Sequence, residues 1–291
     1  MLDDKLKSHF QLHLIVFIWG FTAVLGALIS IKEASLVWYR FLFAGLFLLI
    51  YIIATKKSLK LPLKEIFKIC FVGFLIALHW IYFFKAINIS NVSITLAMFS
   101  LGAFIASILE PIFYQRKILW YEVLFGLIII VGLYFIMQVE INYIDGMLCA
   151  LFSIVIGVIF TLLNGKLIQK HDSTVISFYE FFSGFIFVTV NLFIQEKFNK
   201  SFFEISSKDL ILILILSSIC TAYAFTASIK VMKKLSPYTV MLTTNLEPVY
   251  GIFLAYFIIG GNEKMSISFY IGSVIILITV IINGVIKHLK K

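Results

Sequence analysis

Long apolar runs, separated by short polar breaks, make up almost the whole chain. Each run is roughly 17 to 25 residues long, which is the length of a helix that crosses a bilayer. We count about ten of them: 12–30, 34–54, 66–86, 90–113, 119–138, 146–165, 174–194, 209–229, 238–259 and 267–286. Hydrocarbon offers no partners to backbone groups, so spans of this length must be helices, and the alternation typical of a membrane barrel is absent from the sequence. The pattern predicts an all-α membrane protein with about ten transmembrane helices.

The composition excludes a soluble protein. Hydrophobic residues make up 62% of the chain and charged residues only 13%, whereas a soluble domain is nearly half hydrophobic and a quarter charged. The longest polar stretches, 55–65 and 195–209, are too short to hold a core of their own. The first apolar run is long, has no convincing cleavage site and leads into another run, so we interpret it as mature structure. Function is therefore expected to lie within the membrane part.

The chain has a net charge of +9, and its basic residues are distributed as the predicted topology requires. If the N-terminus is cytoplasmic, most basic residues fall on the cytoplasmic side, among them Lys56, Lys60, Arg116, Lys166 and Lys233. We expect an integral protein of a bacterial inner (plasma) membrane with both termini cytoplasmic. The basic residues orient the chain in the lipid bilayer, and no nucleic-acid partner is expected.

The chain contains a weak internal repeat. A shift by half the length aligns "SNVSITLAM" (90–98) with "SPYTVMLTT" (236–244) and "FGLIIIV" (125–131) with "IGSVIIL" (271–277) without a gap. The fourth span then overlays the ninth, and the fifth overlays the tenth. Because five is an odd number, the second copy must insert upside down relative to the first. We therefore predict two inverted five-helix repeats, residues 1–145 and 146–291.

Several short motifs lie along both copies. The second copy has an Ala-x-x-Lys segment at 227–230, Ser236 with Pro237, "LEP" at 246–248, and Gly261 followed by Glu263. The first copy has Trp19 with Gly20, Arg40, and "ALHWIYFFKAINISNVSI" at 77–94. In these features the chain resembles the EamA family of the drug/metabolite transporter superfamily, over nearly its whole length.

This resemblance implies a ten-helix secondary transporter that exports amino acids or other small organic metabolites by alternating access. Its partners would be a small-molecule substrate, possible coupling protons and the lipid bilayer. The alternatives are a broader drug/metabolite permease, a nucleobase or vitamin permease, or a non-transport intramembrane protein. The oligomeric state stays open, because the small residues Gly126 and Gly132 suit internal packing as well as dimerisation.

Enzymes, pumps and channels lack support in the sequence. No H-E-x-x-H, G-x-S-x-G or P-loop motif is present, so we expect no catalytic residues, no cofactor and a gradient as the energy source. The three cysteines, Cys70, Cys149 and Cys220, lie singly in different spans, which argues against a metal site. A channel would need a filter-like loop or a ring of like charges, and neither is visible.

The strongest candidate for a substrate or proton site is Glu247, which lies inside the ninth run. A charge at the membrane centre costs at least about 2.5 kcal/mol, so it must face protein or a water-filled cavity. Thr239, Thr243 and Glu247 recur every four residues, with Tyr250 three residues further on, which predicts one polar helix face. Pro248 frees the carbonyl of Thr244 and bends the helix, and Asn245 lies within this bend. Glu247 either pairs with a substrate ammonium or a proton, or bonds to a neighbouring helix.

Weaker candidates come from other spans. His79 either relays protons or bridges two helices. Arg40 either binds a carboxylate or extends to the membrane surface, and its place near the end of its span favours the surface. Trp19, Trp80 and Tyr223 are candidate walls for an organic substrate. Glu110 is not the counterpart of Glu247, because the first copy has Gly102 at the position of Pro248.

Overall fold

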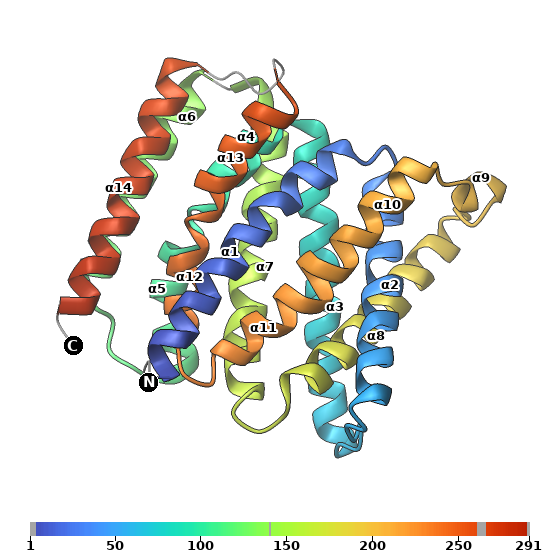
Figure 1. Ribbon diagram of the computed structural model, residues 1–291. Coiled ribbons are helices and arrows are strands. Elements are labelled where there is room, and N and C mark those ends of the chain that lie inside the picture. Colours follow the sequence, from blue (N-terminus) through green and yellow to red (C-terminus); the bar gives the residue numbers. More distant parts are fainter. Residues whose placement is uncertain (1–3, 140, 261–265, 290–291) are drawn as a thin grey trace.

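The computed structural model describes residues 4–139, 141–260 and 266–289, and all regular elements in these ranges are helical (Figure 1). The all-α prediction is confirmed. Gly261 and Glu263 of the motif after the ninth run lie outside the described residues.

The helices follow the predicted runs closely. The first half contains α1 (Asp4–Leu28), α2 (Glu33–Ala54), α3 (Leu63–Ile89), α4 (Val92–Phe99), α5 (Gly102–Tyr114) and α6 (Trp120–Val139). The second half contains a short turn η1 (Ile141–Tyr143), α7 (Ile144–Leu167), α8 (Ser173–Ile194), α9 (Lys200–Phe203), α10 (Ser207–Ile215), η2 (Leu216–Tyr223), α11 (Ala224–Val231), α12 (Pro237–Thr244), α13 (Glu247–Ile258) and α14 (Ile267–Leu289). The short helix α9, in the polar stretch 195–209, has no counterpart in the sequence prediction.

The described residues include 7 helical segments that are long and apolar enough to cross a membrane. Two of these segments combine several elements, α4 with α5 and α10 with η2 and α11. Their length and apolar surface agree with the predicted membrane protein. The total of ten spans and the inversion of the repeats stay predictions.

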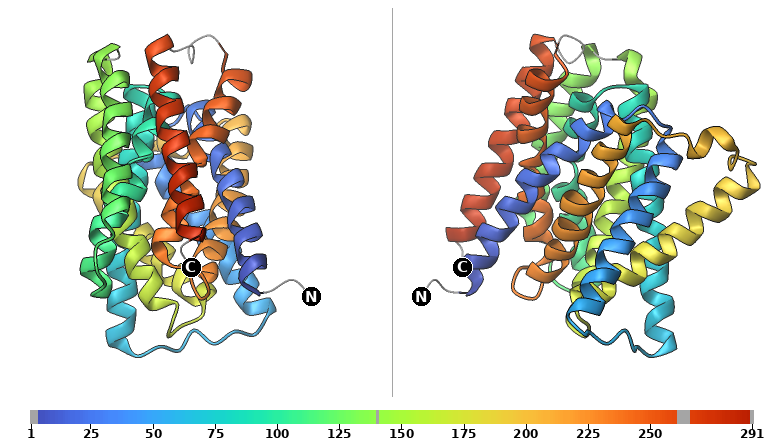
Figure 2. Two further views of the ribbon diagram at one scale, coloured as in Figure 1. Left: turned by 90° about the vertical axis from the view of Figure 1, so that its left-hand side faces the viewer. Right: turned by 45° about the vertical axis from the view of Figure 1, so that its right-hand side comes forward.

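The helices form one bundle with both ends of the described chain at the same end of it (Figures 1 and 2). α3 packs against α7 and α8, while α6 and α14 pair at one edge. Gly73 allows the close packing of α3 on α8, since a Cβ there would collide with Ser183 Oγ and the carbonyl of Glu180. The central helices are therefore held at distances that only small residues permit.

Helix interruptions occur in both halves. α12 starts at Pro237, where Ser236 caps the helix by accepting from the Thr239 amide, and stops at Thr244. After Asn245 and Leu246 the chain resumes as α13, with Pro248 in the first turn, where no amide hydrogen is needed. The helix is interrupted at the predicted place, where Asn245 and Leu246 keep right-handed helical angles but donate to carbonyls three residues earlier.

The first half breaks at Ser100 and Leu101, between α4 and α5, although no proline is present. Under the half-length shift found in the sequence, this break falls within one residue of that at Asn245 and Leu246. A third interruption is η2, a π-helical segment. Such widened turns are frequent at functional sites.

Candidate functional site

A cavity of about 100 Å³ lies inside the bundle, between helices of both halves. It is lined by residues of α1, α2, α3, α4, α7, α11, α12 and α13. Five predicted site residues line it: Trp19, Arg40, His79, Trp80 and Glu247. The wall is mostly apolar with few polar groups, as is usual for a small-molecule site.

Glu247 stands at the start of α13, directly after the helix break. It is 8% exposed, and within the described part of the chain no donor forms a hydrogen bond with its carboxyl group. The amides of the first helical turn give this position a positive electrostatic potential, which favours a carboxylate. The break therefore places a charged side chain at the cavity wall.

Arg40 lies on the same cavity and is only 2% exposed. Its Nε donates a hydrogen bond to Thr221 Oγ1 at 2.7 Å, and its guanidinium carbon lies 3.8 Å from the ring centre of Trp80. Its Nη1 is buried without a hydrogen-bond partner among the described residues. The sequence-based preference for the membrane surface is wrong, because a hydroxyl and an aromatic face hold the guanidinium inside.

The π-helical segment explains how Arg40 is held. In η2 the hydroxyl of Thr221 donates to the carbonyl of Leu216, five residues earlier, at 2.7 Å. With its proton used in this way, the hydroxyl oxygen can accept from Arg40. Trp19 fastens the same segment to α1 by donating from Nε1 to the carbonyl of Cys220 at 3.2 Å.

The cavity thus carries one basic and one acidic side chain, Arg40 and Glu247. In the described part of the chain they form no ion pair within 4 Å. Two further cavity-lining atoms, Thr22 Oγ1 and Asn164 Oδ1, are buried without a hydrogen-bond partner. Buried polar atoms are normally paired, so this set is suited to a polar ligand.

His79 links two helices and also lines the cavity. Its Nδ1 lies 2.8 Å from the carbonyl oxygen of Ser153, while Ser153 Oγ donates to the carbonyl of His79 at 2.8 Å. A carbonyl only accepts, so Nδ1 carries the proton in this contact and Nε2 is the remaining nitrogen. The bridging contact is therefore present, and a relay role stays a prediction.

The other predicted site residues lie away from this cavity. Asn245, Pro248 and Tyr250 line a second hollow of about 820 Å³ beside α1, α4, α13 and α14. Thr239, Thr243 and Tyr223 line neither space, and the Tyr223 side chain is exposed on the outside of the bundle.

Thr239 and Thr243 do not share the cavity with Glu247, because the tighter turn at Asn245 and Leu246 lies between them and changes the phase of the side chains. Val240, Met241 and Thr244 face the cavity in place of Thr239 and Thr243.

Comparisons with known proteins agree with this architecture. The model of the EamA-like transporter family matches residues 6–138 and, a second time, residues 144–285. The chain belongs to the EamA-like transporter family. It is thus a membrane transporter of small molecules, as the motifs in the sequence predicted.

Solved structures share the EamA fold of this chain. A structure entitled "Crystal structure of protein" superimposes with a TM-score of 0.73 over 98% of this chain and 99% of its own, at 13% identity. In all, 27 chains of solved structures match. At this identity the likeness concerns the fold alone. No curated protein matches the chain.

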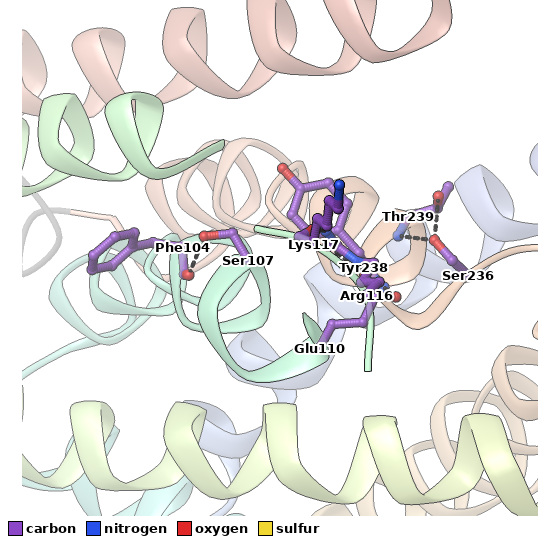
Figure 3. A network of polar contacts seen from close by, with 8 residues as sticks. All are labelled: Phe104, Ser107, Glu110, Arg116, Lys117, Ser236, Tyr238 and Thr239. Atoms are coloured by element: carbon purple, nitrogen blue, oxygen red, sulfur yellow. Dashed lines mark hydrogen bonds and ion pairs between the residues drawn. The ribbon is translucent and has the colours of Figure 1, made fainter. Parts of the chain in front are cut away.

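A polar network joins the two EamA repeats outside the cavity (Figure 3). Arg116 donates from Nε and Nη2 to Glu110 Oε2, at 2.9 and 2.7 Å. The other oxygen, Oε1, accepts from the amide of Tyr238 at 3.1 Å, in the first turn of α12. Glu110 is thus paired, unlike Glu247, which supports treating the two as different.

Asn164 lines the cavity but was not singled out from the sequence, and Glu180 lies outside the cavity lining. Glu180 of α8 is fully buried, and neither carboxyl oxygen has hydrogen-bond geometry with a partner, although the Asn164 amide lies near enough to interact. Asn164 lies in "LLNGK" at the end of a run, where a polar residue is ordinary. The useful signal would have been two polar residues at similar depth in consecutive spans.

Proposed function

We propose that this EamA-like protein is a secondary transporter that exports a small zwitterionic solute, such as an amino acid, by alternating access. The observation that carries the proposal is the pair of buried side chains of opposite charge type, Arg40 and Glu247, on one cavity. Arg40 comes from the first matched repeat and Glu247 from the second.

A zwitterion fits the chemistry of this cavity. Its carboxylate would accept from the free Nη1 of Arg40, and its ammonium would pair with Glu247. In a medium of low polarity an unpaired charge is costly, so a solute that brings one charge of each sign satisfies both side chains at once. Thr22 and Asn164 offer further hydrogen bonds to polar substituents.

Alternating access is supported by the arrangement of the two repeats. α1 and α7, the first helices of the matched repeats, run in opposite directions (Figure 1). Inverted repeats supply two nearly equivalent states, one open to each side. The breaks at Ser100 and Asn245 are places where the halves of a helix can tilt separately. Both termini would be cytoplasmic in a bacterial inner membrane.

Proton coupling would use a carboxyl group that exchanges its proton between the two states. Glu247 is the first candidate because it faces the cavity, and Glu180 is the second because it is buried without a charged partner. A nucleobase or vitamin permease is the alternative function. It is favoured by Trp19 and Trp80, whose rings can stack on a planar uncharged solute.

The test is counterflow into proteoliposomes that contain a mixed pool of amino acids, nucleobases and vitamins, read by mass spectrometry. We expect exchange of amino acids, a loss of at least about tenfold in Arg40→Lys, and loss of the response to a pH gradient in Glu247→Gln. Glu204→Gln, an exposed carboxylate at the end of α9, is the matched control and should behave as the wild type.

Each other outcome selects a different conclusion. Exchange of planar uncharged solutes alone would support the alternative permease. A pH response lost in Glu180→Gln and kept in Glu247→Gln would assign coupling to Glu180. If wild-type protein exchanged no solute of the pool, the proposed transport of a small zwitterion would be refuted.

A further inference from the structure

A groove of about 880 Å³ lies on the bundle between the first turns of α3 and the last turns of α7. It lies at the end of the bundle where both ends of the described chain lie (Figures 1 and 2). It is separate from the transport cavity and shares no lining residue with it.

The floor of the groove is apolar and exposed. Leu63, Phe67 and Phe71 recur every fourth residue of α3 and are 68%, 67% and 56% exposed. Leu163 and Leu167 of α7 lie at the same spacing across from them. Residues at this spacing share one helix face, so the floor forms two parallel apolar rows.

Four lysines lie along the groove. Lys64 and Lys68 are four residues apart on α3, while Lys166 lies in the last turn of α7 and Lys170 in the turn that follows α7. Lys68 is paired with Glu65 at 2.6 Å, and Lys166 lies 5.4 Å from the ring centre of Tyr114.

Glu65 is the one acidic residue among those lining the groove as described, and it also contacts His171 Nε2 at 3.0 Å. Lys64 and Lys170 have no ion pair in the described part of the chain. The groove therefore has a clear excess of positive charge.

We propose that this groove binds an anionic phospholipid. Its phosphate would lie between Lys64 and Lys170, and an acyl chain would follow Phe67 and Phe71. A soluble anion would leave these exposed aromatic rings without a partner. A lipid of zero net charge would not neutralise the excess positive charge of the lysines. Basic pockets between transmembrane helices on the cytoplasmic side are suited to such headgroups.

The position of the groove gives the bound lipid a structural role. α3 and α7 belong to different EamA repeats, and further along they are joined by the contact between His79 and Ser153. A lipid held across their ends would add a further link between the repeats. Binding to this arrangement would stabilise it by an amount that grows with the logarithm of the affinity.

The test is native mass spectrometry of the full chain in detergent, with phosphatidylglycerol or phosphatidylcholine of identical acyl chains. We expect phosphatidylglycerol to bind more tightly. Removing both unpaired cations in Lys64→Gln/Lys170→Gln should weaken its binding by roughly 30-fold, and Lys64→Arg/Lys170→Arg should restore it. Lys230→Gln/Lys233→Gln removes the same charge from exposed positions at the same end of the bundle and should leave binding unchanged.

Three results would overturn the proposal. The two lipids could bind equally, or the control pair could lose as much affinity as the groove pair. Alternatively, millimolar inorganic phosphate could displace the lipid, which would make the groove a site for soluble anions.

Discussion

The contact of Glu110 with Arg116 and Tyr238 is expected to hold the two repeats together. In Glu110→Ala, the guanidinium of Arg116 and the amide of Tyr238 lose three hydrogen bonds to a side chain that is 5% exposed. Breaking a buried ion pair costs about 3–5 kcal/mol. Arg116 is 27% exposed and can regain some hydration, so we expect the lower end, about 3 kcal/mol. At about 2 °C per kcal/mol for a chain of this size, the Tm should fall by about 6 °C.

Thermal unfolding in detergent, followed by intrinsic fluorescence, measures this shift. Glu110→Gln keeps an acceptor for the Tyr238 amide and loses only the charge, so its Tm should lie between those of Glu110→Ala and the wild type. Glu204→Gln removes an exposed carboxylate and should leave the Tm unchanged. A Tm of Glu110→Ala within 1 °C of the wild-type Tm would be no larger a change than the loss of an exposed ion pair causes. That result would show that the network does not hold the repeats together.

Two further substitutions test the packing and the helix ends. Gly73→Ala should destabilise the protein by about 1–3 kcal/mol, because its Cβ would press on the backbone of Glu180, while Gly45→Ala, with open space around it, should cost nothing in the same unfolding assay. Asp172 caps α8 and binds Lys57 at 2.8 Å; burial raises its pKa, but the hydrogen bonds from Lys57 and Thr174 outweigh this and lower it overall. This contribution to stability is present above the unfolded pKa of about 3.9 and is lost as the pH falls through the lower folded-state pKa. Asp172→Asn should therefore lower the Tm slightly at pH 7, and its difference from the wild type should shrink as the pH falls below about 3.9.

The helical fold could be predicted from the sequence because few backbone structures can cross a membrane. Runs of about 20 apolar residues must be helices, and Pro248 marks an interruption by its chemistry. The break at Ser100 and Leu101 has no such residue, and only its alignment with the second copy suggests it. The repeat was therefore more informative about the first half than its own residues were.

The candidate site could be predicted from the sequence only in part. Glu247 could be identified because a carboxylate inside an apolar run is costly wherever it lies. The direction of the Arg40 side chain could not, because it depends on Thr221 and Trp80, which are distant in sequence. Thr239 and Thr243 were expected beside Glu247 on the assumption of a continuous helix, and two residues outside the helix are enough to change that.

The π-helical segment at Leu216–Tyr223 has a consequence for where a positive charge can rest in the membrane. One extra residue in a turn rotates everything after it by about 100° relative to a regular α-helix. A strictly α-helical version of the same sequence would aim the Thr221 hydroxyl elsewhere, and Arg40 would lose its only side-chain acceptor among the described residues. The position of the Arg40 guanidinium thus depends on the helical geometry of a segment that is about 180 residues away along the chain.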